Sequence, residues 1–237
     1  MRHYACQHNQ RSCLSHNASG HCAHATGSDR SVSFFFLLIP SFNVMYEHVV
    51  VKEGVLWIDG VHMQRFHGAT PQQNAAFMVG QLRVKTGDKV LDIGTGLGYT
   101  VVEELKRGAK VTTIEQSDKV LELLKQSANS GILEDKNAEL VYGDAFQEVK
   151  KFPSASFNSV LHDPPRFSMA GELYSGAFYA ELNRVLKPHG ILFHYTGKPS
   201  LRSGKNLLKG IKARLQAAGF HGVQWVEPCL GFKCFKF

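Results

Sequence analysis

The stretch 90–99, VLDIGTGLGY, constrains the fold of this chain more than any other part of it. A short apolar run carries Asp92 near its end, and Gly94, Gly96 and Gly98 follow at intervals of two residues. Glycine allows the backbone to turn with positive φ and to approach a ligand closely. The stretch therefore predicts a strand, a tight loop and the start of a helix. That arrangement receives nucleotide-like ligands at the end of a parallel strand.

Around and after this stretch, β-branched apolar runs alternate with segments of helical character. Strands are expected over residues 89–93, 110–115, 139–142, 157–162 and 190–195. Helices are expected over residues 99–107, 117–127, 146–150, 177–186 and 204–218. Alternation at these lengths is typical of an α/β fold, in which a doubly wound parallel sheet carries helices on both faces. Two last strand-like runs, 221–226 and 232–237, flank a turn and predict a closing antiparallel hairpin.

The segment before the glycine-rich stretch has a different pattern of apolar and polar residues. Residues 46–61 alternate apolar and polar side chains around glycine turns, which predicts two short strands. Thr70 and Pro71 then form a typical helix start, and apolar residues continue the helix to about residue 83. We expect residues 45–85 to cover a ligand site that belongs to a domain spanning 86–237.

Residues 1–44 are rich in His, Ser and Asn and show no sustained period. We interpret them as a disordered N-terminal extension, and the folded protein is expected to start near Met45. A metal-binding tract is an alternative, because His and Cys are metal ligands, but their spacing here is irregular. The arginines and serines also resemble an organelle transit peptide.

Net charge and cysteine content limit the partners and the cellular compartment that the sequence can suit. The formal net charge is +7 and the pI is about 9.2, which suits an acidic partner such as RNA or a solvated basic surface. Cys6, Cys13 and Cys22 lack zinc-site spacing, and the odd total of five cysteines argues against a closed set of disulfides; no metal is expected. Reduced thiols predict a cytoplasmic protein, with an organelle as the alternative. No apolar run approaches bilayer length, so no membrane partner is expected.

Acidic residues stand where two further predicted strands end. Glu115 follows Asp92 by 23 residues, a spacing at which an acid accepts hydrogen bonds from ribose hydroxyls in nucleotide-binding folds. Asp144 and Ala145 follow the next strand. A carboxylate there can accept from the exocyclic amine of an adenine, or it can cap the helix that follows. The acids and the glycines predict a nucleoside site at one edge of the sheet.

The loop after the strand 157–162 reads HDPPRF and has its own chemistry. Its two prolines fix φ and remove two backbone donors, which leaves carbonyls and the Asp163 carboxylate facing the crevice. Asp163 and the Pro164 carbonyl are candidates to accept hydrogen bonds from an attacking amine. His162 is a candidate proton acceptor, since its ordinary pKa is near neutral, or a packed strand-end imidazole. Arg166 and Phe167 are candidates to bind the substrate.

Together these features resemble the class I S-adenosylmethionine-dependent methyltransferases. The resemblance covers residues 70–237 and implies a seven-stranded sheet with a reversed last strand. It also implies S-adenosyl-L-methionine as cofactor and a direct displacement, in which the protein mainly positions the acceptor. The implied cofactor residues are Asp92, Gly94, Gly96, Gly98, Tyr99, Glu115, Asp144 and Ala145.

Four phrases give a closer resemblance, to a family of predicted archaeal-type methyltransferases of which some members carry spermidine-synthase-like labels. They are GLGYT at 96–100, HDPPRFS at 162–168, AGELYS at 170–175 and FHYTG at 193–197. Amine-methylating enzymes usually place an aromatic residue directly after the second proline, where this chain has Arg166. Stacking by Phe167, or binding of a carboxylate or phosphate by Arg166, are the alternatives.

The predicted function is therefore methyl transfer to an unidentified amine-type acceptor, with RNA as one candidate for the molecule that carries it. Aminopropyl transfer from decarboxylated S-adenosylmethionine is one alternative. It would require an acidic pocket, which Asp163 and Glu172 begin to form. A non-catalytic module that binds nucleic acid is the other. The sequence leaves the oligomeric state unknown.

Overall fold

A computed structural model describes residues 48–64, 68–197 and 204–237, all within one compact unit that spans Asn43–Phe237. The extension predicted for residues 1–44, and the start expected near Met45, lie outside the described residues.

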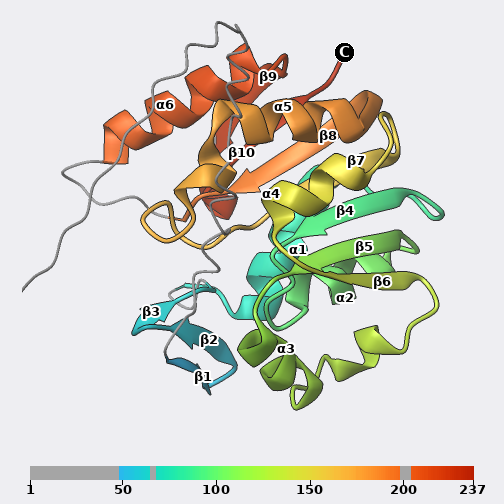
Figure 1. Ribbon diagram of the computed structural model, residues 1–237, viewed down its shortest axis with the longest axis vertical. Helices are drawn as coiled ribbons and strands as arrows, with labels where there is room; N and C mark the ends of the chain where they lie inside the picture. The colour runs from blue at the N-terminus through green and yellow to red at the C-terminus, as the bar shows by residue number, and fades with distance from the viewer. Residues whose placement is uncertain (1–47, 65–67, 198–203) are drawn as a thin grey trace, which may run out of the picture. The chain divides into compact units, whose positions relative to one another are not determined.

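Seven strands form the main sheet, in the order β6-β5-β4-β7-β8-β10-β9 (Figure 1). Their bounds are β4 Lys89–Ile93, β5 Lys110–Glu115, β6 Ala138–Tyr142, β7 Phe157–His162, β8 Leu186–Tyr195, β9 His221–Val226 and β10 Gly231–Phe235. The strands from β6 to β8 pair in parallel, and β10 runs antiparallel to both β8 and β9. This confirms the predicted doubly wound α/β sheet and its antiparallel C-terminal hairpin.

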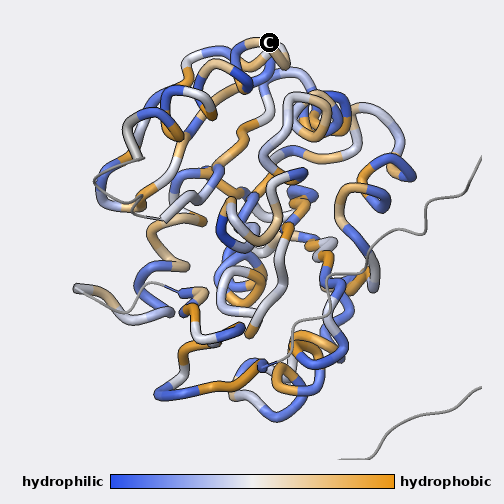
Figure 2. The backbone as a smooth tube through the Cα atoms, turned by 60° about the vertical axis from the view of Figure 1, so that its left-hand side comes forward, coloured by the Kyte–Doolittle hydropathy of each residue, from blue (hydrophilic) through white to orange (hydrophobic). Residues whose placement is uncertain are grey.

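Six α-helices are described, and they cover both faces of the sheet (Figure 1). They are α1 Pro71–Leu82, α2 Tyr99–Lys106, α3 Asp118–Lys125, α4 Ala145–Glu148, α5 Gly176–Val185 and α6 Gly204–Ala217. Buried side chains of α1, α2 and α3 pack in one hydrophobic cluster, and those of α4, α5 and α6 pack in another. Hydrophilic stretches alternate with hydrophobic ones along the helices, as an amphipathic covering layer requires (Figure 2). In the described part of the chain, no helix is both long and apolar enough to cross a membrane.

The strand β8 begins earlier than the sequence predicts. The sequence predicts a strand over residues 190–195, but the strand begins at Leu186. It continues through an irregularity in its pairing with β7, where His189 adopts a φ of 63°. A Cβ at Gly190 would lie 2.9 Å from the carbonyl oxygen of Lys187, so glycine permits the close backbone approach here.

A small three-stranded antiparallel sheet precedes the main one. Its strands are β1 Val49–Lys52, β2 Val55–Ile58 and β3 Val61–His62, where the sequence predicts only two. The side chains Leu56 and Ile58 of β2 pack with Leu97 of the glycine loop and Val120 of α3. The helix α1 then starts at a capping box, in which Thr70 and Gln73 bond to each other's backbone N–H.

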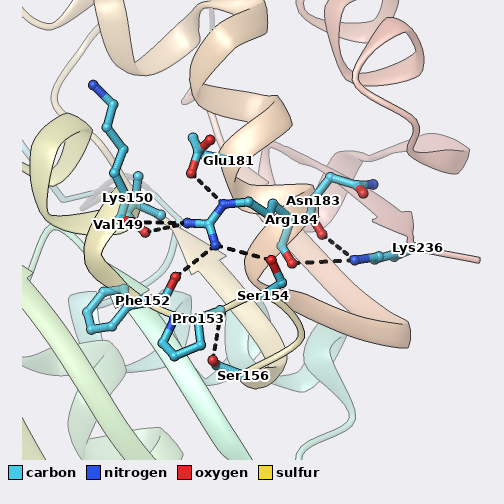
Figure 3. Close-up of polar contacts among 10 residues, drawn as sticks. All are labelled: Val149, Lys150, Phe152, Pro153, Ser154, Ser156, Glu181, Asn183, Arg184 and Lys236. Carbon is cyan, nitrogen blue, oxygen red and sulfur yellow. Dashed lines mark hydrogen bonds and ion pairs between the residues drawn. The ribbon is translucent and has the colours of Figure 1, made fainter.

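Arg184, near the end of α5, joins that helix to the segment that leads into β7 (Figure 3). Its guanidinium donates to the carbonyl oxygens of Phe152 at 2.8 Å and Val149 at 3.0 Å, and pairs with Glu181 at 2.8 Å. Longer contacts reach the Lys150 carbonyl at 3.5 Å and the Ser154 hydroxyl at 3.4 Å. Lys236 donates to the carbonyl of Asn183 at 2.7 Å, at the C-terminal end of the same helix. These contacts lie at the amino end of β7, whereas the predicted ligand loop lies at its carboxyl end.

Three short 3-10 helices lie in the loops after strands β5, β6 and β7, at Ser130–Leu133, Val149–Lys151 and Gly171–Tyr174, and a fourth, at Glu227–Cys229, separates β9 from β10. The one at Gly171–Tyr174 (η3) matters for the site, because it follows the HDPPRF loop and carries Glu172 toward the sheet edge.

Candidate active site

A cavity opens at the carboxyl ends of the parallel strands. Its empty volume is about 720 Å³, part of which is open to solvent. The loops after β4 and β7 meet at this cavity, and these strands are the two between which the connections change direction. Ligands bind at such a switch point in open α/β sheets. Its polar side chains are Gln64, Glu115, Gln116, Asp144, Asp163 and Glu172.

The glycine loop approaches the HDPPRF loop closely. Gly94 has a φ of 94°, and a Cβ there would collide with the carbonyl oxygen of Asp163. Gly96, at a φ of 53°, lines the cavity with its bare backbone. Gly98 begins α2 at a φ of 73°, and a Cβ on it would meet the side chains of Ile132 and Leu124. Gly94 and Gly96 therefore face the cavity, whereas Gly98 is required for packing beneath the loop.

Asp92 lies under the loop and does not line the cavity. Its side chain is fully buried, and the Thr113 hydroxyl donates to Oδ1 at 2.7 Å. Because Thr113 donates its proton to Asp92, the Thr95 hydroxyl at 2.6 Å must be the donor to Thr113. Burial raises the pKa of Asp92 to about 6, and the hydrogen bond from Thr113 opposes that rise. The geometry thus makes Asp92 an internal anchor of the loop, where the resemblance implies a cofactor residue.

Glu115 lines the cavity at the end of β5. Its Oε2 accepts from the backbone N–H of Gly96 at 3.1 Å, and its Oε1 accepts from those of Gln116 and Ser117 at 3.0 Å each. Burial raises the pKa of Glu115, and these three backbone donors oppose the rise. Three of the roughly four acceptor positions of the carboxylate are thus occupied, and the one left on Oε2 can accept from a ribose hydroxyl in the cavity.

Asp144 and Ala145 line the cavity at the end of β6. One oxygen of Asp144, Oδ1, accepts from the Phe146 backbone N–H at 2.9 Å and so caps α4. The residue thus has the capping role that the sequence left open, and its position in the lining leaves the second oxygen available to a ligand amine.

Asp163 and Pro164 form the opposite wall. The Asp163 backbone N–H donates to the carbonyl oxygen of Ile93 at 2.9 Å, which connects the end of β7 to the end of β4. Burial, with the charge of Asp92 as a smaller cause, raises the pKa of Asp163 to about 8. At neutral pH the carboxyl group is therefore largely protonated until a cationic ligand favours its charged form.

His162 is not among the residues that line the cavity. Its ring is fully buried, stacked on His194 with 4.3 Å between ring centroids, and its Nε2 lies 2.9 Å from the Leu173 carbonyl oxygen. A carbonyl only accepts, so Nε2 carries the proton. Burial holds the pKa of His162 well below its usual value. His162 therefore does not face the cavity, because α5 packs over the end of this strand and covers the ring.

The two residues predicted to bind the substrate lie outside the lining as well. Phe167 is 45% exposed and packs edge-on against Tyr174. Arg166 places Nη2 3.1 Å from Nε2 of His62 on β3. Since Nδ1 of His62 lies 3.0 Å from a carbonyl oxygen and must donate to it, Nε2 is the acceptor for Arg166. Arg166 thus links the HDPPRF loop to the small sheet.

The small sheet supplies a wall of the cavity that sequence reasoning did not assign to residues. Leu56, Ile58, Met63 and Gln64 line it. Tyr99 donates its hydroxyl to the Gly54 carbonyl at 2.7 Å and so fastens this sheet to the start of α2. The sequence predicts that residues 45–85 cover the site, but it does not indicate which of them line the cavity, because these contacts join segments far apart in the chain.

Of the described residues that line the cavity, none is Lys, Arg or His, although the chain as a whole carries a formal charge of +7. Four carboxyl groups line it, from Glu115, Asp144, Asp163 and Glu172. A ligand with a positive centre and hydroxyl donors fits this set of acceptors, and a sulfonium nucleoside is such a ligand. S-adenosylmethionine therefore matches the donor and charge requirements of the residues present.

The sheet and site define a class I S-adenosylmethionine-dependent methyltransferase. Residues 90–190 match the family model described as a methyltransferase domain. A solved spermidine synthase, in complex with the transition-state analogue AdoDATO, shares the fold at a TM-score of 0.60 and 24% identity. The match covers 77% of this chain and 65% of that one.

The chain belongs to the family of the uncharacterized protein MJ1233 of Methanocaldococcus jannaschii. The two are 43% identical over 197 residues, which cover 83% of this chain and 68% of that protein. Polyamine aminopropyltransferase 2 of Streptomyces coelicolor is 28% identical over 176 residues, and the probable ribosomal RNA small subunit methyltransferase A of Thermococcus sibiricus is 36% identical over 87. The chain spans 31% and 29% of the length of these last two relatives.

Proposed function

We propose that this enzyme transfers the methyl group of S-adenosylmethionine to an amine-type acceptor. One observation carries the proposal: Asp163 and Pro164 lie against Gly94, on the wall opposite the acids that suit a nucleoside. The cofactor supplies a methyl group that its sulfonium already activates. Carboxylate and carbonyl acceptors on this wall would hold an amine by its N–H groups and aim its lone pair.

In this proposal each side chain has a limited role. Glu115 would accept from the ribose hydroxyls, and the free oxygen of Asp144 from the adenine amine. Asp163 would orient the acceptor and take up its proton, since burial already favours the protonated form of the carboxyl group. The small sheet would exclude water, because Leu56, Ile58 and Met63 present apolar side chains to the cavity.

Binding and product formation test the proposal. S-adenosylmethionine, its decarboxylated form and NAD are titrated by calorimetry, and S-adenosylhomocysteine is followed in the presence of amine, RNA and protein acceptor pools. We expect S-adenosylmethionine to bind and its product to appear with at least one pool. Binding of RNA without any cofactor binding would instead support a non-catalytic module.

Aminopropyl transfer is the second candidate, and the four carboxyl groups of the cavity are the observation that favours it. The similarity to polyamine aminopropyltransferase 2 is consistent with it. The same titration separates the two reactions. Tight binding of the decarboxylated cofactor alone, with 5′-methylthioadenosine as product, would replace methyl transfer by aminopropyl transfer.

A further inference from the structure

Asn74 is a buried amide on α1 whose carbonyl side has no hydrogen-bond partner among the described residues. Its side chain is 3% exposed, and its Nδ2 makes only a weak contact with the Met78 sulfur at 3.7 Å. Buried acceptors in native proteins are nearly always paired. The unpartnered Oδ1 at this position is therefore available to accept a hydrogen bond from a ligand.

The orphaned amide lines a second hollow next to the main cavity. This hollow has an empty volume of about 370 Å³, part of it open to solvent. It meets the main cavity at residues that line both, among them Gly94, Gly96 and Asp163. A ligand group in the hollow therefore reaches the wall at which we propose that the methyl group is transferred.

The chemistry of the hollow suits an aliphatic amine. Oδ1 of Asn74 and the carboxyl group of Asp163 are two of its acceptors, besides the amide of Gln64 and several hydroxyl groups. None of its described lining residues is Lys, Arg or His. Aliphatic walls come from Met63, Pro71 and Met78. Phe167, the aromatic residue of the HDPPRF loop, does not line it. The aromatic residues that do are Tyr99, whose hydroxyl bonds to the Gly54 carbonyl, and Tyr195.

We propose that this hollow binds the alkylammonium group of the acceptor, because acceptors without a cationic side chain in the described lining suit a cation better than a neutral base. The substrate is then an aliphatic amine. The inference rests on the proposed function and narrows it. The bound ammonium gives one proton to the Asp163 carboxylate, and the freed nitrogen lone pair then attacks the methyl carbon. A nitrogen–carbon bond forms as the carbon–sulfur bond breaks, and the sulfonium becomes the neutral thioether of S-adenosylhomocysteine. The raised pKa of Asp163, about 8, brings its carboxylate closer to the basicity of an alkylamine and supports the proton transfer.

The test measures methyl transfer by the full chain from labelled S-adenosylmethionine to 1-aminobutane, 1,4-diaminobutane and transfer RNA. We expect transfer to the aliphatic amines. Asn74→Leu should raise the KM for the amine at least tenfold while the Kd for S-adenosylhomocysteine changes less than twofold. Asn74→Asp keeps an acceptor oxygen at the same site, so its KM should stay within threefold of the wild type.

Gln72→Leu is the matched control, because Gln72 is exposed on the same helix and lines neither cavity. Its KM should equal that of the wild type. If Asn74→Leu does not fold, Asn74→Asp and the stabilisation of the wild-type chain by 1,4-diaminobutane, measured by thermal unfolding with S-adenosylhomocysteine present, still decide the question. No stabilisation by the diamine would overturn the inference.

Two other outcomes would also contradict it, and a third would count against the proposed function. Transfer to RNA bases alone would overturn the aliphatic acceptor and leave methyl transfer standing. Loss of S-adenosylhomocysteine affinity in Asn74→Leu, with an unchanged amine KM, would assign the hollow to the cofactor. Absence of transfer to every acceptor class, despite cofactor binding, would instead count against the proposed function itself.

Discussion

Glu115 is the residue on which cofactor affinity is expected to depend most. Its carboxylate is fixed by three backbone N–H groups and faces the cavity. Glu115→Gln retains the size of the side chain but replaces an acceptor oxygen by a donor. Hydrogen bonds to a charged group contribute about 1.5–3 kcal/mol, so we expect the Kd for S-adenosylhomocysteine to rise about 10- to 100-fold. Calorimetric titration measures it.

The matched control is Glu139→Gln, on the neighbouring strand β6, where the carboxylate is exposed and lines neither cavity. Its Kd should equal that of the wild type. Equal affinities in both variants would remove Glu115 from the cofactor site.

Asp163 is expected to make stability depend on pH. Its pKa is raised from 3.8 to about 8 in the folded chain, so between these pH values the folded state holds a proton that the unfolded state has released. Stability conferred by this group is therefore present at low pH and is lost as the pH rises toward 8. Asp163→Asn removes the titration, and we expect the variant to gain stability relative to the wild type between pH 5 and pH 8.

Urea unfolding at the two pH values measures this gain, and methyl transfer should be abolished in the same variant. A stability difference that is the same at pH 5 and pH 8 would contradict the raised pKa. Retained turnover would contradict the role of Asp163 in the reaction.

At the scale of elements, the hydroxyl of Tyr99 is expected to hold the small sheet over the cavity. Tyr99→Phe removes only the hydrogen bond to the Gly54 carbonyl. A hydrogen bond of this kind contributes about 0.5–1.5 kcal/mol, so a sheet that closes less often should release S-adenosylhomocysteine about 2- to 10-fold faster. Stopped-flow displacement measures the rate.

Tyr142→Phe is a suitable control for Tyr99→Phe, because Tyr142 is 56% exposed and lines neither cavity. Its release rate should match the wild type. Identical rates in Tyr99→Phe and the wild type would show that the bond to Gly54 does not control access.

The elements that the sequence predicts well are those whose signal is local. The strands at 110–115 and 157–162 agree with the structure, because β-branched and apolar runs bounded by turns need no tertiary information. The start of β8 was missed because Gly190 reads as a breaker, whereas it allows the strand to pass a close backbone contact. The predicted strand likewise places His162 at its end, as the structure does, but the sequence does not indicate that α5 covers the His162 ring.

The residues of the site likewise divide into those with a local sequence signal and those that depend on tertiary packing. The glycine loop and the acids at 115, 144 and 163 could be placed from spacing along the chain, because carboxyl ends of parallel strands share one edge of a sheet. The walls formed by Gln64 and Asn74 could not be placed from the sequence, since they depend on how the small sheet and α1 pack. A polar Asn74 within the apolar stripe of a helix was the one local signal available.

For the molecule as a whole, stability and cofactor binding are expected to separate between the two ends of the sheet. Arg184 lies at the amino end of β7, where its half-buried guanidinium bonds to three carbonyl oxygens, one hydroxyl and one carboxylate (Figure 3). Arg184→Met retains much of the apolar contact of the side chain but leaves those carbonyls without their donor. We expect the free energy of unfolding to fall by about 2 kcal/mol, as measured by urea denaturation.

The Kd for S-adenosylhomocysteine should stay within twofold in Arg184→Met, because nothing in this network lines either cavity. Lys150→Met is the control: that side chain is exposed and its ammonium contacts only Gln147 and the face of Phe146, so the loss should be under about 0.5 kcal/mol. A rise in Kd as large as that expected for Glu115→Gln would mean that the two ends of the sheet are coupled. The sheet would then transmit strain from its amino edge to the glycine loop, and the ligand site could not be treated as a property of the carboxyl edge alone.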